Sequence, residues 1–113
     1  MTIQRIQPGP RMSHAVVHGD TVYLAGQVAE GASVEEQSRA VLQRVDELLA
    51  TVGSDKSKLL SVTIYLADIA TFGEMNSVWD AWVDPANPPA RATVEAKLAT
   101  PDYLVEFVIT AAV

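Results

Sequence analysis

The order of apolar and polar residues along the chain predicts six strands and two helices. Apolar residues recur at helical spacing over 34–52 and again over 75–82. Runs rich in β-branched and apolar residues flank these helices. They cover residues 3–6, 15–18, 21–25, 59–66, 92–96 and 105–112. This order predicts an α+β fold, in which a mixed β-sheet carries two helices packed on one face.

Glycines mark two turning points in the first half of the chain. Gly19-Asp20 separates two β-prone runs, and a glycine that comes first in a two-residue loop favours a type II′ hairpin turn. Gly26 follows the second run, directly before Gln27. A glycine at this place indicates a β-bulge or a close approach of another group to the backbone.

Capping signals bound the predicted helices. Ser33 and Glu36 have the spacing of a capping box, and so do Thr71 and Glu74. Gly53 follows the first apolar stripe, where a glycine often terminates a helix. The two helices are therefore expected to begin after Ser33 and Thr71.

The chain is more apolar than a small domain needs. Residues 1–113 are predicted to form a single domain, and 49% of them are hydrophobic. The run over 59–66 is almost continuously apolar, which is typical of a strand covered on both sides. Two helices on one face leave the other sheet face bare, so we expect association with further copies of the chain to cover it.

Charge and residue types narrow the function classes. The net charge of −6 is unfavourable for nucleic-acid binding, because phosphates need basic surface. No apolar stretch is long enough for a membrane span, and the N-terminus lacks the pattern of a signal peptide, so a cytoplasmic protein without a membrane partner is expected. Cysteine is absent, and His14 and His18 are four residues apart, too far in extended chain for one ion, and lack further ligands, so no metal site is predicted.

Two charged residues are candidates for chemistry. Arg91 follows a rigid proline-containing connector, and its guanidinium is suited to a carboxylate ligand. The alternative is a solvated or salt-bridged surface arginine. Glu106 interrupts an apolar strand, where a carboxylate needs a partner. Its alternative is a position on the solvent-facing side of an edge strand.

Several segments together resemble the Rid family, also called the YjgF/YER057c/UK114 family. They are Leu24-Ala25-Gly26-Gln27, the helix with Asn76, the block from Pro89 to Glu95, and Val105-Glu106-Phe107. The resemblance implies a chorismate-mutase-like fold and a homotrimer with clefts between subunits. Archetypal members hydrolyse reactive 2-imino acids, or their enamine tautomers, to 2-keto acids and ammonia, without a cofactor or metal.

The resemblance also implies roles for individual residues. Arg91 matches the arginine that binds the substrate carboxylate, and Glu106 matches the carboxylate that orients the attacking water. Gly26 matches the backbone site near the nitrogen end of the substrate. Phe72 and Asn76 match positions that line the cleft.

Two positions depart from the archetype. Met12 stands where the family has a pocket-closing tyrosine, and Thr93 stands where a cysteine is common. Both are expected to line the substrate site, and Thr93 to assist in holding the water. Because of these changes, a non-catalytic module that binds small carboxylates in the same cleft is the alternative function. The endoribonuclease activity ascribed to some members conflicts with the acidic charge.

Overall fold

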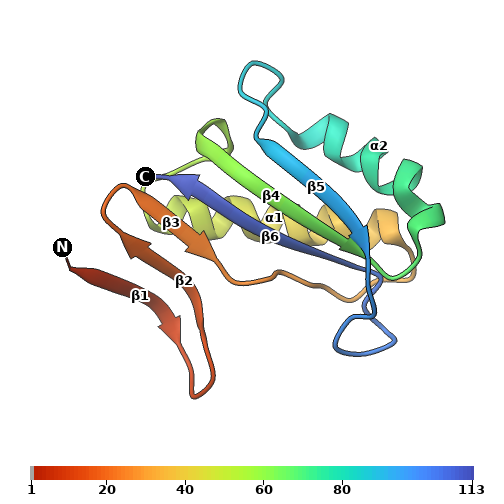
Figure 1. Cartoon of the computed structure of the whole chain (residues 1–113), viewed down its shortest axis with the longest axis horizontal. Coiled ribbons are helices and arrows are strands. Elements are labelled where there is room, and N and C mark those ends of the chain that lie inside the picture. The colour runs from red at the N-terminus through yellow and green to blue at the C-terminus, as the bar shows by residue number, and fades with distance from the viewer. Residues whose placement is uncertain (1) are drawn as a thin grey trace.

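A single mixed sheet organises the part of the chain that the structure describes, residues 2–113 of a computed structural model (Figure 1). The strand order is β1-β2-β3-β6-β4-β5, and only β4 and β5 run parallel. The strands are β1 (Ile3–Pro8), β2 (Ser13–His18), β3 (Thr21–Leu24), β4 (Leu59–Leu66), β5 (Ala90–Glu95) and β6 (Val105–Ala112), and the helices are α1 (Val34–Thr51) and α2 (Phe72–Trp82). The predicted element order and α+β class are confirmed.

Strand pairing explains where the sequence prediction needed correction. The ranges of β4 and β6 match the prediction. Strand β5 begins at Ala90 rather than Ala92, because Ala90 already pairs with Ser61 of β4. The first strand ends at Pro8 rather than at Ile6 as predicted, since Pro8 pairs with Ser13. These extensions arise from partners distant in sequence, which local pattern does not reveal.

The hairpin turn and the first helix follow the predicted chemistry. Gly19 has a φ of 63°, whereas Asp20 is not left-handed, as a type II′ turn requires. The Ser33 hydroxyl accepts a hydrogen bond from the Glu36 amide at 3.1 Å, which is one half of the predicted capping box, whereas the Glu36 carboxylate accepts from the Ala32 amide at 3.0 Å rather than from Ser33. Gly53 follows the C-cap of α1 with a φ of 75°.

The predicted second capping box is wrong. Thr71 does precede α2, but its side chain makes no capping hydrogen bond. The Glu74 carboxylate instead accepts a hydrogen bond from the Glu35 amide in the first turn of α1, at 2.8 Å. A tertiary partner has therefore replaced the local one, and the beginnings of the two helices are joined.

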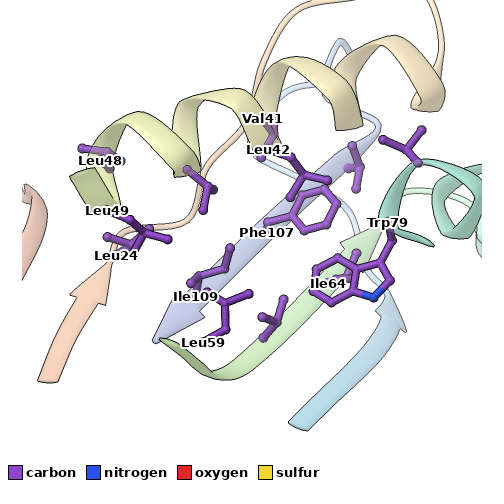
Figure 2. Close-up of a cluster of buried hydrophobic side chains, with 14 of the residues drawn as sticks. Leu24, Val41, Leu42, Leu48, Leu49, Leu59, Ile64, Trp79, Phe107 and Ile109 are labelled. Carbon is purple, nitrogen blue, oxygen red and sulfur yellow. The ribbon is translucent and has the colours of Figure 1, made fainter. Parts of the chain in front are cut away.

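Both helices pack on the same face of the sheet. Phe107 of β6 is fully buried, and it lies beneath Val41 and Leu42 of α1 with Trp79 of α2 beside it (Figure 2). The Phe107 and Trp79 rings stack, with centroids 6.4 Å apart and planes 9° apart. The molecule is only 20 Å deep along its shortest axis, which corresponds to one sheet and one helix layer. Neither helix in residues 2–113 is long and apolar enough to cross a membrane.

The other side of the sheet, here called the open face, carries apolar side chains without a cover. Register places Glu106 beside Tyr65, and Tyr65 beside Val94, all pointing away from the helices. Tyr23 is 50% exposed and Val94 is 42% exposed on this face. A single chain therefore covers β4 on one side only, which leaves the other side for the expected association with further copies.

Candidate functional site

Arg91 points to the helix face of the sheet at its β5 edge. It pairs with Val62 of β4, which belongs to the core, and its guanidinium donates a hydrogen bond to Asn76 Oδ1 at 2.8 Å. The only ion pair within residues 2–113 joins Arg39 to Glu35, so no carboxylate in that range neutralises Arg91. An arginine has five N–H donors, and most of those of Arg91 are left for a ligand.

One face of α2 surrounds this guanidinium. Phe72, Asn76 and Trp79 are four and then three residues apart, so they lie on the same side of the helix. The Arg91 Cζ atom lies 5.7 Å from the ring centroid of Phe72 and 5.3 Å from that of Trp79, within cation–π range. We call Arg91, Asn76, Phe72 and Thr93 the arginine half-site.

Thr93 belongs to this half-site because it lies two residues along β5, on the same face as Arg91. It pairs with the buried Ile64, and its hydroxyl is inaccessible to solvent and has no hydrogen-bond partner. A buried polar atom without a partner is unusual in a folded protein. In a single chain Thr93 therefore cannot hold a water together with Glu106, whose side chain is on the other face.

Glu106 lies on the open face, directly against Gly26. A Cβ atom on Gly26 would come within 2.9 Å of the Glu106 Cδ, so only glycine leaves room for this carboxylate. The predicted irregularity at Gly26 has a structural origin. Tyr23 pairs with Thr110 and Gln27 bridges Phe107, so the chain takes four steps from Tyr23 to Gln27 where β6 takes three. This is the count of a β-bulge.

The surroundings of Glu106 correct one sequence alternative. Strand β6 lies between β3 and β4, so Glu106 is not on an edge strand. It is half-buried and lines a hollow of about 300 Å³ on the open face. The other residues that line this hollow are Tyr65, Ala96, Lys97, Leu98, Ala99 and Val108. We call Glu106 and Gly26 the glutamate half-site.

Met12 lies in the turn between β1 and β2. It is 52% exposed, and its carbonyl accepts a hydrogen bond from the Gly9 amide at 2.7 Å. Two residues later, the His14 carbonyl accepts a hydrogen bond from the Ala25 amide at 2.9 Å. The chain next to Met12 therefore runs alongside the segment that carries Gly26.

Within one chain the two half-sites point in opposite directions. Residues that pair across strands share a face, and Arg91 belongs with Val62 and Ile109, whereas Glu106 belongs with Tyr65 and Val94. The sheet itself separates the guanidinium from the carboxylate. A single copy of the chain therefore does not bring Arg91 and Glu106 to one substrate.

No group of three or more His, Cys, Asp or Glu side chains in residues 2–113 is arranged to hold a metal ion.

Comparison with known proteins places the whole chain in one family. The sequence profile described as Endoribonuclease L-PSP matches residues 2–113. A RutC family protein of Haemophilus influenzae is 49% identical over 114 residues, covering 98% of each chain. The crystal structure of NMB1025 from Neisseria meningitidis, a member of the YjgF protein family, has a TM-score of 0.97 and 45% identity, covering 99% of this chain and 95% of that one. The chain belongs to the YjgF (Rid) family.

Other Rid relatives match with similar completeness. The RutC family protein YoaB of Escherichia coli K12 is 44% identical over 115 residues and is covered over its full length, as is this chain. Rv2704 of Mycobacterium tuberculosis, described as a member of the YjgF/YER057c/UK114 family, has a TM-score of 0.90 at 26% identity. The resemblance drawn from the sequence motifs is thereby confirmed at the level of the family.

In this Rid-family chain, one contact of the arginine half-site was missed by sequence reasoning. Trp79 belongs to the apolar stripe predicted over 75–82, and it is indeed buried, but it also lies against Arg91. Its spacing from Phe72 and Asn76 was the available signal. That spacing becomes informative only once β5 is known to lie beneath α2.

Proposed function

We propose that this protein hydrolyses reactive 2-imino acids, or their enamine tautomers, to 2-keto acids and ammonia in clefts between the subunits of a homotrimer. The observation that carries the proposal is the separation of its two charged half-sites. Arg91 lacks an anionic partner within residues 2–113, and Glu106 occupies the opposite face of the sheet. Two copies of the chain are needed to supply both groups to one ligand.

The arginine half-site is suited to a carboxylate. The guanidinium is half-buried, and Asn76 and two aromatic rings fix its position while most of its donors stay unused. A planar guanidinium binds a carboxylate through two parallel hydrogen bonds, which fixes the orientation of the ligand as well as its location. The unpartnered hydroxyl of Thr93 is a further polar group on this side.

The glutamate half-site supplies the chemistry in this proposal. Glu106 accepts a hydrogen bond from a water molecule and directs its oxygen to C2 of the imino acid. The new C–O bond converts the C=N double bond into a single bond, and one water proton passes to the nitrogen. The second water proton then follows to the nitrogen as the C–N bond breaks, so ammonia leaves and the oxygen stays as the keto group. The backbone at Gly26 lies next to the carboxylate, on the side assigned to the substrate nitrogen. Positioning of water and imine provides most of the rate.

The uncovered sheet face supports the proposed assembly. Tyr23 and Val94 leave substantial apolar surface exposed, and other copies of the chain are the simplest cover. Strand β5 forms an edge of the sheet and carries Arg91, so a neighbouring copy can approach this residue without displacing another strand. In the proposed trimer the open faces meet in a central core and the helices lie outside.

The acidic charge separates this proposal from an activity on RNA. The matching profile is described as Endoribonuclease L-PSP, but this chain has a net charge of −6. A trimer multiplies that charge, which repels a phosphate backbone. A small substrate with a single carboxylate needs only the local cation Arg91.

The first prediction concerns imine decay. When 2-iminopropanoate or 2-iminobutanoate is generated in situ, we expect the wild-type protein to accelerate its loss beyond the spontaneous rate. Arg91→Ala should lower kcat/KM by about 100-fold or more, because the carboxylate loses its charge-assisted anchor. Arg39→Ala is the matched control, since Arg39 is exposed and pairs with Glu35 on α1. Equal rates for wild type and Arg91→Ala would remove the proposal for these substrates.

The binding alternative is separated in the same experiment. Calorimetry with pyruvate, 2-ketobutyrate and benzoate measures whether the arginine half-site holds a carboxylate at all. Binding that depends on Arg91, without any acceleration of imine decay, would identify a non-catalytic carboxylate-binding module. The departures at Met12 and Thr93 are the sequence reason for including this measurement.

A second prediction follows from the contact between Gly26 and Glu106. Gly26→Ala forces the carboxylate aside, and because the carboxylate ends a flexible side chain, we expect a stability change below about 1.5 kcal/mol. The value of kcat should fall by about 10- to 100-fold, since a misplaced base no longer directs the water. Gly73→Ala is the control, because its Cβ meets no atom within 4 Å. Full activity in Gly26→Ala would exclude Glu106 from the reaction.

A further inference from the structure

We infer that Trp79 is a positioning residue that holds the Arg91 guanidinium in the orientation in which it receives a carboxylate. The Arg91 Cζ atom lies 5.3 Å from the centroid of the Trp79 ring, closer than to the Phe72 ring at 5.7 Å. The inference rests on the proposed function for the role of Arg91 in binding. The position of the guanidinium itself is a property of the protein without ligand and is testable separately.

The first step of the argument is that Trp79 cannot easily move. Its side chain is only 6% exposed, and it stacks on Phe107, which is fully buried beneath α1. A ring held between the core and a cation is a fixed surface rather than a mobile neighbour. Tryptophan is also the aromatic side chain that attracts a cation most strongly.

The second step is that the hydrogen bond to Asn76 leaves the Arg91 guanidinium free to rotate, and that Trp79 restricts this rotation. Asn76 accepts a hydrogen bond from Nη1 of Arg91, which fixes one end of the guanidinium. A single hydrogen bond permits the planar group to rotate about it. Phe72 comes four residues before Asn76 and Trp79 three residues after it, and their two rings restrict that rotation. The remaining donors are thereby fixed in direction before a carboxylate arrives, which lowers the entropic penalty of binding.

The third step distinguishes Trp79 from the neighbouring tryptophan. Trp82 lies 5.5 Å from Trp79, but its indole N–H donates to Asp46 at 3.0 Å and its ring lies under Lys56. Trp82 therefore faces the groove between α1 and α2 and has no recorded contact with Arg91. It provides a matched control of the same residue type on the same helix.

The first measurement needs no substrate. The chain has five arginines, so their Nε–Hε resonances can be resolved by NMR, and the Arg91→Lys variant identifies the resonance of Arg91 by its loss. Ring currents of Trp79 should shift the Arg91 side-chain protons upfield of those of the other arginines. Trp79→Leu should move the resonance toward the solvated position, whereas Trp79→Phe, which keeps a ring, should retain much of the shift. Trp82→Phe should leave it unchanged.

The second measurement is calorimetric binding of 2-ketobutyrate. Trp79→Leu is expected to raise Kd by about 3- to 30-fold, the range of a partly desolvated cation–π contact. Trp79→Phe should stay within about threefold of wild type, although both substitutions remove core volume. In the imine assay the loss should appear in KM more than in kcat. If Trp79 only filled the core, Trp79→Leu and Trp79→Phe should raise Kd by similar factors.

The outcomes separate this inference from the proposed function. An Arg91 resonance that does not respond to Trp79→Leu, or that in wild type coincides with the solvated arginines, overturns the inference even if imines are hydrolysed. The comparison of the Arg91 resonance with those of the solvated arginines uses only the wild-type protein, so it tests the inference even if Trp79→Leu does not fold. A shifted, Trp79-dependent resonance in a protein that neither binds 2-ketobutyrate nor hydrolyses imines overturns the proposed function while the guanidinium position stands.

Discussion

Two inactive variants, Arg91→Ala and Glu106→Gln, are expected to restore activity to each other when their subunits are mixed. In the proposed trimer each cleft takes its arginine from one subunit and its glutamate from the next. A cleft between a Glu106→Gln subunit, which keeps Arg91, and an Arg91→Ala subunit, which keeps Glu106, contains both groups. With equal amounts and random exchange, about a quarter of the clefts are complete, so about a quarter of wild-type activity should return.

The opposite placement of the two half-sites is the reason for this expectation. Within a single chain, strand pairing places Arg91 on the helix face and Glu106 on the open face. Each variant alone should have almost no activity, because each removes one group from every cleft. Samples should be mixed after partial dissociation and reassembly, and native mass spectrometry should establish that the subunits have exchanged.

Controls distinguish two ways in which the proposal can fail, a wrong cleft and a wrong oligomeric state. In a mixture of wild type with a double variant that carries both substitutions on one chain, exchange should lower activity from about half to about a quarter of wild type, because a complete cleft then needs two wild-type subunits. If exchanged mixtures of the single variants stay inactive, Arg91 and Glu106 do not meet between copies and the proposed cleft is wrong. If the mass spectra contain only monomers while wild type is active, the trimer is wrong and the activity must be assigned to one chain.

The second large effect is expected at Gln37, a buried residue of α1. Gln37 has no exposed surface, and both its side-chain nitrogen and its side-chain oxygen form hydrogen bonds. Its amide nitrogen donates to the carbonyls of Gly31 and Asp102, at 3.0 and 2.8 Å, and its oxygen accepts from the Leu104 amide at 2.8 Å. The side chain thereby ties α1 to the segment that leads into β6, the strand of Glu106.

Gln37→Met should therefore destabilise the protein by about 2–4 kcal/mol. The variant has a similar volume, but it leaves backbone groups without partners, each of which costs about 1–3 kcal/mol where water cannot replace the bond. Chemical denaturation measures the loss, and hydrogen exchange at the Leu104 amide should accelerate. Gln43→Met is the control on the exposed side of the same helix, with an expected change within about 0.5 kcal/mol. An unchanged unfolding midpoint in Gln37→Met would exclude this role.

Gln37 also illustrates the limit of pattern reasoning. Helical spacing identified the apolar stripe of α1, and Val41, Val45 and Leu49 are buried as that stripe predicts. A glutamine between such positions has the appearance of an exposed residue. Its partners lie as far as 67 residues away in the chain, and only their arrival in space makes its burial favourable.

Glu74 is a related case, because it has the spacing of a capping residue but its side chain binds a different helix. Its spacing from Thr71 predicts a capping box, whereas its carboxylate accepts a hydrogen bond from the amide of Glu35 on the other helix. At the first helix, the Ser33 hydroxyl does accept the predicted bond from Glu36. The two outcomes differ because Thr71 is already used by the turn before α2, where its amide and its hydroxyl both donate to the Asp68 carbonyl.

The sequence by itself determined the order of elements, the hairpin turn, the apolar surplus and the family, because these depend on residues close together or on motifs of fixed spacing. It also identified Arg91 and Glu106 as unusual charges. Only the tertiary structure decided that Trp79 lies against Arg91 and that Glu106 fills the space left by Gly26. It also decided that the two charges face opposite sides of the sheet. The physical reason is that the face of a strand residue relative to a distant strand depends on register and bulges, which are set by pairing across the sheet.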